Sequence, residues 1–257
     1  MVHKLDRIKN LKKINDDSNN GGNLYTDYQL LYKLFDDNPC FLDEKERNVH
    51  YLYKKRLFHP YVLDILYHGF GKKKRFLGYV QEFIPNAKTF RDGISDQEIS
   101  YEEKEKIIGD VFDKLRILHA EDKYLGDVHL ENFIYNEDGG YIIDLDEIRF
   151  QGVDDFNFED CYLIKPDHNS PAIRIADRYT DNVKTMIASL SFLYGFDLEA
   201  IVKNGTLVDV KQYLECMIED KEFQGKVFQI LDCRDEVTYF DEILGNTVSK
   251  KERSEKR

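Results

Sequence analysis

The sequence predicts an α+β protein with two lobes, and three observations support this prediction. Residues 1–85 hold short apolar and aromatic runs separated by Gly and Asn turns, which indicate antiparallel strands, together with one stretch of helical spacing. Residues 86–248 hold long stretches whose apolar residues recur at helical spacing. The pair Pro85-Asn86 separates the two patterns, so we place the lobe boundary there. The charged tail 249–257 is expected to be disordered.

Composition favours a globular protein and argues against two classes of partner. The chain has 257 residues, of which 42% are hydrophobic and 33% charged, an ordinary globular mixture. The net charge of −12 (37 basic minus 49 acidic residues) argues against broad binding of nucleic acids or anionic membranes. No apolar run is long enough for a signal peptide or a membrane span. Scattered cysteines without a C-x-x-C pair indicate free thiols. We therefore expect a soluble, cytoplasmic protein.

The first half is expected to form an antiparallel sheet and one helix. The predicted strands are Leu11–Ile14, Asn23–Tyr25, Leu30–Phe35, Tyr61–His68 and Phe76–Phe83. The helix is predicted over Asp43–Leu57, because its acidic residues come early, its basic residues come late and its apolar residues follow helical spacing. A turn at Gly21-Gly22 could bring backbone N–H groups close to a phosphate, although such a turn also occurs in ordinary hairpins.

The second half is expected to be mainly helical. Ser100 and Glu103 form a capping box, and apolar residues then repeat along one helix face up to Leu118. Further helices are predicted over Asp181–Tyr194, Leu207–Glu219 and Lys221–Ile230.

The stretch Leu118–Phe150 combines a hairpin signal with acidic and amide side chains. An Asp-Gly-Gly turn separates the predicted strands Phe133–Tyr135 and Tyr141–Leu145. Asn132 lies at the start of the first strand and Asp144 at the end of the second. A hairpin places these ends side by side, and amide and carboxylate oxygens are ligands that Mg²⁺ accepts.

Asp127 precedes this hairpin and could have a different role from the two metal-binding candidates. Its carboxylate could accept a proton from a hydroxyl nucleophile without binding the metal. Asp127, Asn132 and Asp144 together therefore suggest phosphoryl transfer.

The pattern D-V-H-L-E-N at 127–132, followed by I-D-L-D at 143–146, resembles the catalytic loop and metal-binding strand of the protein-kinase-like superfamily. The resemblance covers roughly residues 10–195 in the right order. Gly22-Asn23-Leu24 looks like the end of the glycine-rich loop, and Leu31-Tyr32-Lys33 like the strand that carries the phosphate-binding lysine. Residues 78–84 look like the last N-lobe strand and hinge, and Asp181 like the aspartate that ties a helix to the catalytic loop.

This resemblance implies a bilobal kinase-like fold that uses ATP and Mg²⁺. Lys33 would contact the α- and β-phosphates, held by Glu46 or Glu44, and Asp127 would orient or deprotonate the acceptor hydroxyl. Asn132 and Asp144 would hold Mg²⁺. The other nucleotide-binding positions would be Gly21, Gly22, Gln81 at the gatekeeper position, and the backbone of Glu82 and Ile84 at the adenine edge.

Three residues depart from the protein-kinase pattern. Gly126 stands where an arginine reads a phosphorylated activation loop, so switching by loop phosphorylation is not expected. His129 replaces the usual lysine and is more familiar from aminoglycoside and choline kinases and from divergent bacterial kinases. Asp146 replaces a glycine, which leaves the assignment of the metal ligand between Asp144 and Asp146; Asp144 is preferred because it directly follows Ile142-Ile143.

These features predict a phosphotransferase, with the acceptor left open. The separation of Asp144 and Asp181 leaves room for an activation segment, which favours a protein Ser/Thr hydroxyl as the acceptor. His129 and the missing arginine favour a small-molecule alcohol. A third alternative is a pseudokinase that binds a nucleotide or a partner without catalysis.

Overall fold

The protein consists of two compact units. The computed structural model describes residues 11–14, 22–35, 39–69, 71, 74–125, 127–150, 164–173, 176–234 and 238–244. Unit 1 comprises Met1–Ala87 and Ile143–Glu147, and unit 2 comprises Lys88–Ile142 and Ile148–Arg257. The α+β class is thus as predicted, and the first boundary falls after Ala87, close to Pro85-Asn86. The tail 249–257 lies outside the described residues.

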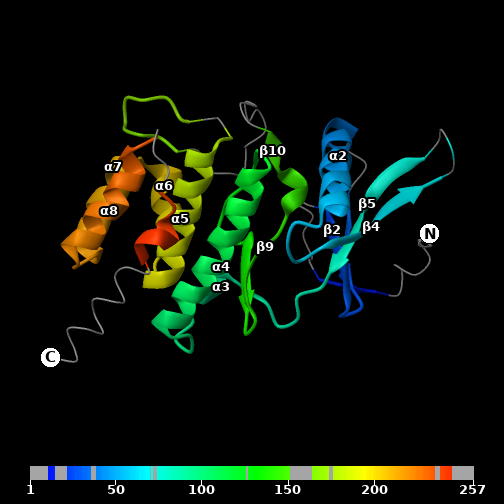
Figure 1. Ribbon diagram of the computed structural model, residues 1–257, viewed down its shortest axis with the longest axis horizontal. Helices are drawn as coiled ribbons and strands as arrows, with labels where there is room; N and C mark the ends of the chain where they lie inside the picture. Colours follow the sequence, from blue (N-terminus) through cyan, green and yellow to red (C-terminus); the bar gives the residue numbers. More distant parts are fainter. Residues whose placement is uncertain are drawn as a thin grey trace. The chain divides into compact units, whose positions relative to one another are not determined.

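Unit 1 is an antiparallel sheet with a helix beside it. The strands are β1 (Lys12–Lys13), β2 (Asn23–Thr26), β3 (Leu30–Leu34), β4 (Val62–His68) and β5 (Arg75–Glu82). They pair in the order β1-β2-β3-β5-β4, all antiparallel. Helix α2 (Pro39–Lys55) contacts β4 and β5, drawn in blue and cyan in Figure 1. All five strands match the predicted ranges to within one or two residues.

One face of this sheet carries a buried apolar cluster, and helix α2 adds further buried apolar side chains to unit 1. Tyr32, Leu66 and Val80 come from three neighbouring strands and form one buried cluster. Because side chains alternate along a strand, the neighbours of Tyr32 and Val80 in sequence point to the opposite face. Helix α2 buries Val49 and Leu52, which are 0% and 7% exposed. The helix begins before the predicted Asp43, at Pro39.

The segment Ile143–Glu147 belongs to unit 1, which corrects the predicted domain limits. The sequence placed all of residues 86–248 in the second lobe, including Asp144. In the structure the 3-10 helix η2 (Leu145–Glu147) packs against α2. The physical reason is a set of hydrogen bonds to Asp146 from Lys33 and Asn48, which attach this segment to the sheet and to α2.

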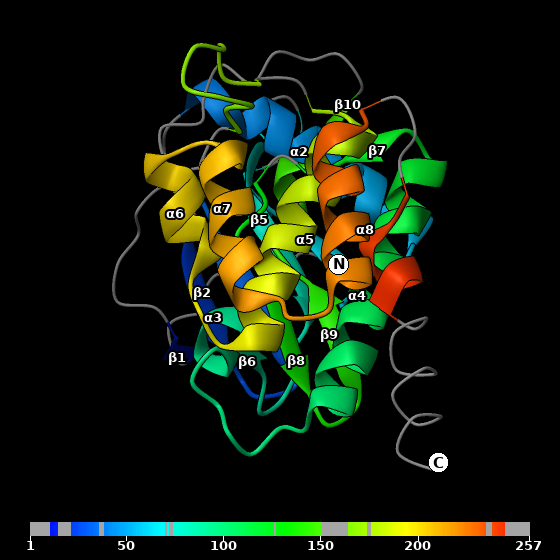
Figure 2. The same ribbon diagram turned by 90° about the vertical axis from the view of Figure 1, so that its left-hand side faces the viewer.

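Unit 2 is mainly helical. Its helices are α3 (Phe90–Gly93), α4 (Tyr101–Ala120), α5 (Arg178–Tyr194), α6 (Leu198–Asn204), α7 (Leu207–Met217) and α8 (Lys221–Asp232). The capping box predicted for Ser100 is present at the start of α4. Helix α5 packs against α4 and α6, and α7 packs against α8 (Figure 2). Asp177 caps α5, so Asp181 lies in its first turn rather than at its start.

Short strands complete unit 2 and hold the predicted hairpin. They are β6 (Lys88–Thr89), β7 (Lys123–Tyr124), β8 (Phe133–Asn136), β9 (Gly139–Ile142) and β10 (Arg149–Phe150). β8 pairs with β9 and with β6, and β7 pairs with β10. The hairpin is as predicted, but β9 ends at Ile142, so Asp144 follows the strand and does not lie in it.

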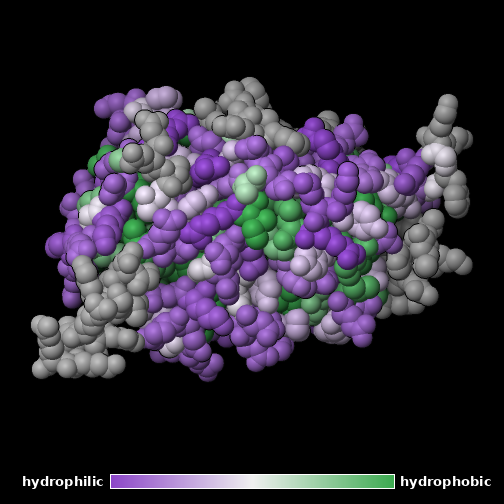
Figure 3. All heavy atoms as spheres, viewed as in Figure 1, coloured by the Kyte–Doolittle hydropathy of each residue, from purple (hydrophilic) through white to green (hydrophobic). Residues whose placement is uncertain are grey.

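The exposed surface is strongly polar, as the composition suggests. In Figure 3, hydrophilic side chains cover most of the displayed surface of both units, and hydrophobic atoms appear in interrupted areas. Among the described helices, none is long and apolar enough to cross a membrane.

Gly140 offers a test of how α4 supports the hairpin. A Cβ atom added at Gly140 would lie 2.3 Å from the carbonyl oxygen of Ile107 in α4, whereas a Cβ at Gly109 in the same helix would meet nothing within 4 Å. We expect Gly140→Ala to reduce the free energy of unfolding by about 1–3 kcal/mol through this backbone clash. Gly109→Ala should instead stabilise the protein by about 0.5–1 kcal/mol. Urea titration of both variants measures the difference, and equal effects would contradict the packing described.

Candidate active site

Lys33 is a buried cation on the sheet of unit 1. It lies in β3 directly opposite Tyr79 of β5 in the antiparallel ladder. Its position next to Tyr32 turns it to the face opposite the Tyr32 cluster, and it is only 2% exposed. A lysine buried to this extent requires anionic partners, because desolvation of its charge is costly.

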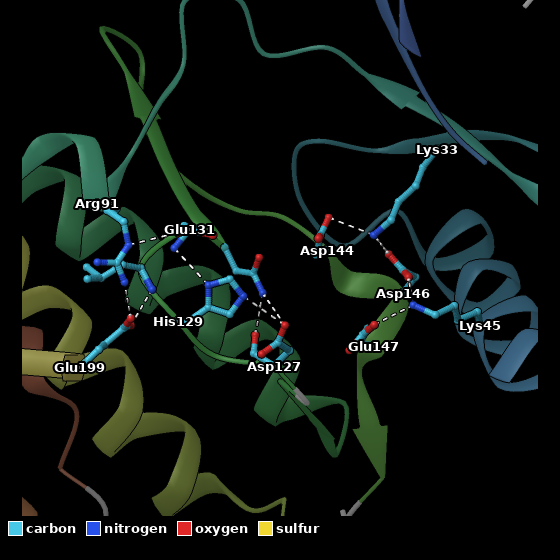
Figure 4. A network of polar contacts seen from close by, with 12 residues as sticks. Lys33, Lys45, Arg91, Asp127, His129, Glu131, Asp144, Asp146, Glu147 and Glu199 are labelled. Atoms are coloured by element: carbon cyan, nitrogen blue, oxygen red, sulfur yellow. Dashed lines mark hydrogen bonds and ion pairs between the residues drawn. The ribbon is translucent and has the colours of Figure 1, made fainter. Parts of the chain in front are cut away.

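Two aspartates provide those partners. The Lys33 ammonium lies 2.8 Å from Oδ1 of Asp146 and 3.1 Å from Oδ1 of Asp144 (Figure 4). Burial lowers the pKa of Lys33, but the charges of Asp144 and Asp146 outweigh this effect and raise its pKa well above the ordinary value. Lys33 is therefore held in its charged form.

Asp144 and Asp146 differ in burial, and they therefore differ in their access to a ligand. The Asp146 side chain is 0% exposed, and its Oδ1 also accepts a hydrogen bond from Tyr79. The Asp144 side chain is 36% exposed and its backbone is left-handed, with φ of 59°. Aspartate is one of the few residues that tolerates this conformation, and strained backbone of this kind clusters at functional sites. Of the two acids, Asp144 is the one with room for a ligand.

Helix α2 holds Asp146 with a lysine and an asparagine. Nζ of Lys45 lies 2.8 Å from Oδ2 of Asp146 and 2.6 Å from Oε1 of Glu147. Nδ2 of Asn48 donates a 3.0 Å hydrogen bond to the backbone oxygen of Asp146. Burial raises the pKa of Asp146, but the charges of Lys33 and Lys45 dominate and its net pKa is well below the ordinary value.

The predicted role of Glu46 or Glu44 as the partner of Lys33 does not match these contacts. Glu46 accepts a 2.8 Å hydrogen bond from the Tyr67 hydroxyl and lies 3.8 Å from His50. Glu44 forms an ion pair with Arg47 at 3.6 Å. The reason is helical geometry: the α2 side chain that reaches Asp146 is Lys45, one position away from either glutamate.

The predicted nucleotide-binding backbone lies at the end of β5. Gln81 is buried at 8% exposure, and the N–H group of Glu82 donates to the carbonyl oxygen of Tyr61 at 3.2 Å. Ile84 follows the strand. The carboxylate of Glu82 accepts the N–H group of Tyr61 at 2.9 Å, so this end of β5 is bound to the chain before β4.

One of the two predicted loop glycines is described. Gly22 has φ of 89°, and a Cβ atom there would lie 2.5 Å from the carbonyl oxygen of Leu34, so this turn requires glycine. Gly21 lies outside the described residues, so the predicted phosphate contact of this turn stays a prediction.

In unit 2, Asp127, His129 and Asn132 lie together. Oδ2 of Asp127 is 3.1 Å from Nε2 of His129 and 3.2 Å from Nδ2 of Asn132 (Figure 4). The Asn132 amide also donates to the backbone oxygen of Asp127 at 3.0 Å, which fixes Nδ2 on this side. The Asp127 side chain is 26% exposed. The arrangement orients a carboxylate that is partly exposed to solvent.

His129 is partly buried beside Asp127. Burial lowers the pKa of His129, but the hydrogen bond and charge of Asp127 and the charge of Glu199 outweigh this and raise its pKa. In the neutral ring, Nδ1 accepts the N–H group of Glu131 at 3.3 Å, so the proton lies on Nε2 and is donated to Asp127.

Asp181 ties α5 to the loop that carries Asp127. Its carboxylate accepts the N–H group of Leu125 at 2.7 Å and lies 3.0 Å from Nε2 of His119. Asp181 and His119 are each 1% exposed. The prediction that Asp181 links this helix to the loop is confirmed. Gly126 lies outside the described residues.

Glu199 of α6 provides a second anchor for the same loop. Its Oε1 accepts the N–H group of Leu130 at 2.5 Å, and its Oε2 accepts Arg91 at 3.1 Å. Arg91 also contacts Glu131 at 3.1 Å (Figure 4). A further contact of Arg91, at 2.6 Å, is with Asp197. The loop is thus held on both sides of Asp127 by buried carboxylates.

The structure therefore brings the predicted residues together in two groups. Lys33 and Asp144 lie together in unit 1, and Asp127 and Asn132 lie together in unit 2. No group of three or more His, Cys, Asp or Glu side chains suited to a metal occurs among the described residues. That finding leaves room for Mg²⁺ bound in part by phosphate and water, since this ion is commonly held by one or two protein ligands.

Sequence analysis did not single out Lys45, Asn48, Tyr79, Arg91 and Glu199. The sequence did contain a signal for Lys45 and Asn48. Lys45 and Asn48 stand at the i and i+3 positions of a stripe that continues with the buried Val49 and Leu52. Polar residues on the buried stripe of a helix indicate a polar partner. Glu199 has no such signal, because its partners are distant in sequence.

Comparison with known proteins does not assign the chain to a family. No model of a known protein family matches the sequence, and no similar sequence is found among curated proteins. The resemblance to the protein-kinase-like superfamily therefore stays a prediction that depends on the motifs and on the site geometry.

Loss of the Asp146 charge should destabilise the protein strongly. Asp146→Asn would leave Lys33 and Lys45 without their shared carboxylate, and removal of one partner from a buried ion pair costs about 3–5 kcal/mol of unfolding free energy. Asp113→Asn is the control, because the Asp113 side chain is 75% exposed and the change should cost less than about 1 kcal/mol. Urea denaturation measures both, and similar small losses would contradict the description of a buried ion cluster.

Glu199 should make stability depend on pH. Burial raises the pKa of its carboxyl to about 7, against the opposing charges of His129 and Arg91. The folded protein thus holds this proton more tightly than the unfolded chain does, so ionisation of Glu199 lowers stability as pH rises from about 4.5 to 7.

We expect Glu199→Gln, which keeps an oxygen for the Leu130 N–H group, to gain stability relative to wild type by up to about 3 kcal/mol between pH 5 and pH 8. Thermal unfolding across this pH range measures the difference. Glu215→Gln, at an exposed position, should show a constant difference. A constant difference for Glu199→Gln as well would contradict the raised pKa.

Proposed function

We propose that the protein is an ATP-dependent phosphotransferase that transfers the γ-phosphate of Mg-ATP to a hydroxyl group, with a protein Ser or Thr as the leading acceptor. The observation that carries the proposal is the Lys33 ammonium, buried and 3.1 Å from the partly exposed Asp144. A fixed lysine can neutralise phosphate oxygens, and a carboxylate beside it can hold the magnesium ion that accompanies them.

Asp127 would act on the acceptor. Its carboxylate receives hydrogen bonds from His129 and Asn132, and its loop is held by Asp181 and Glu199. A carboxylate fixed in this way can orient a hydroxyl group and accept its proton as the phosphoryl group is transferred. Rigid support of this kind is what precise orientation requires.

Asp144 and Asn132 fit Mg²⁺ by donor type. Asp144 offers a carboxylate with 36% side-chain exposure, and Asn132 is oriented with Nδ2 on Asp127, which leaves its Oδ1 as the metal-binding atom. When bound, the ion would neutralise charge on the transferred phosphoryl group. Asp146 is a poor ligand because lysines occupy both of its oxygens. That Asn132 and Asp144 share one ion stays a prediction.

ATP would bind along the end of β5 in unit 1. Lys33 and Gln81 face away from solvent, and Glu82 and Ile84 supply backbone groups at the end of the strand. Because the N–H group of Glu82 already donates to Tyr61, an adenine contact at Glu82 would use its carbonyl oxygen.

A second candidate is a kinase of small alcohols. The contact between His129 and Asp127 supports it, since a histidine at this position resembles aminoglycoside and choline kinases. A third candidate is a nucleotide-binding protein without catalysis. It is supported by the ion pairs of Lys33, which within the described part of the chain are with aspartates and not with a glutamate.

A transfer assay tests the proposal. The protein is incubated with labelled Mg-ATP and a generic Ser/Thr protein, or an aminoglycoside or choline-type alcohol. We expect label on the protein acceptor, and a loss of about 10²–10⁴-fold for Asp127→Asn, the usual contribution of a positioned acid or base. Lys33→Met should lose about 10²–10³-fold, as when one electrostatic contact to the transition state is removed.

Each unit offers a matched control. Asp138→Asn lies at the turn of the β8–β9 hairpin, and Lys13→Met lies on β1 at an exposed position; both should leave turnover unchanged. Transfer only to small alcohols would replace the protein acceptor by the second candidate. Nucleotide binding without turnover would favour the third, and no nucleotide binding would contradict all three.

A further inference from the structure

Helix α2 presents a cation, not a carboxylate, to the buried ion cluster of unit 1. We define this cluster as Lys33, Lys45, Asp144, Asp146 and Glu147. Lys45 is 12% exposed at its side chain and contacts two of the three acids. Its ammonium also lies 4.9 Å from the centre of the Phe35 ring, which adds a favourable contact.

Asp146 connects the two lysines through its two different oxygens. Oδ1 accepts Lys33 and the Tyr79 hydroxyl, and Oδ2 accepts Lys45, with distances of 2.8, 2.9 and 2.8 Å. A carboxylate bound on both oxygens has one orientation. If Lys45 is removed, Lys33 still pairs with Oδ1, but Oδ2 becomes a buried acceptor that has lost its charged donor, and the carboxylate gains by turning toward other donors or solvent.

We propose that Lys45 is a positioning residue for Lys33: it fixes the Asp146 carboxylate, and Asp146 in turn fixes the Lys33 ammonium. This inference refines the proposed function, because Lys33 is the group assigned to the phosphates there. It also explains how Lys33 is held although Glu46 lies with Tyr67.

The geometry of α2 supports a direct link between the helix and Lys33. Lys45 and Asn48 lie one turn apart and hold the carboxylate and the backbone oxygen of the same residue, Asp146. The helix therefore binds both the side chain and the backbone of Asp146. A displacement of α2 would move Asp146, and with it the partner of Lys33.

The first measurement does not depend on catalysis. Lysine acetylation by an N-hydroxysuccinimide ester, read by mass spectrometry, reports how accessible and how firmly held each amine is. Lys33 is 2% exposed and paired, so it should react slowly in the wild type. In Lys45→Met we expect Lys33 to react about tenfold faster, the size that corresponds to loss of one charge-assisted hydrogen bond.

The second measurement compares ligands with and without phosphate. Lys45→Met should weaken ATP binding about tenfold and leave adenosine binding unchanged, because only phosphates contact Lys33 in the proposed function. A merely structural loss would weaken both ligands. In turnover, the KM for ATP should rise more than kcat falls.

Three further variants make the test specific. Lys45→Arg keeps the charge and should remain close to wild type in both measurements, while Lys54→Met removes an exposed lysine of the same helix and should have no effect. If Lys45→Met does not fold, Lys45→Gln retains one donor and replaces it. Unchanged Lys33 acetylation in Lys45→Met or its Gln substitute would overturn the inference. Failure of the wild type to bind ATP would overturn the proposed function, and the acetylation result would still decide the role of Lys45.

Discussion

The burial of Asp146 between two lysines is the interaction on which unit 1 depends. Its carboxylate joins a strand residue, Lys33, to a helix residue, Lys45, and its backbone oxygen joins Asn48. These contacts place the segment Ile143–Glu147 in unit 1, although the hairpin before it belongs to unit 2. Asp144, two residues earlier, is partly exposed and has a left-handed backbone. Asp146 thus connects the sheet to helix α2 and holds Lys33, the residue proposed to contact phosphate.

In unit 2, two buried carboxylates, those of Asp181 and Glu199, hold the loop that carries the partly exposed carboxylate of Asp127. Asp181 accepts Leu125 and Glu199 accepts Leu130, so the loop around Asp127 is bound at both ends to helices. The pKa values differ accordingly: burial raises those of Asp181 and Glu199, while the lysines lower that of Asp146. Burial and neighbouring charges thus shift the pKa values of chemically identical carboxyl groups in opposite directions in the two units.

Much of the fold and part of the site could be predicted from local sequence. Strands and helices follow from periodicity, capping residues and turn glycines, which act over a few residues, and they agree with the structure to within a few positions. The kinase-like motifs also pointed to Lys33, Asp127, Asn132 and Asp144, and the structure brings Lys33 next to Asp144 and Asp127 next to Asn132. The predicted partner of Lys33, Glu46 or Glu44, does not contact it, because the rotation of α2 turns Lys45 toward the ion cluster in place of either glutamate.

By itself, the sequence determined the α+β class, the order of the elements and the charged and amide side chains on which the proposed function rests. Those properties depend on side-chain periodicity and on covalent spacing, which the chain carries before it folds. Only the tertiary structure decided which carboxylate is buried and which is exposed, and that α2 contributes a lysine to the cluster. The reason is that burial and ion pairing join residues about a hundred positions apart, such as Lys33 and Asp146, and no local pattern encodes such a contact.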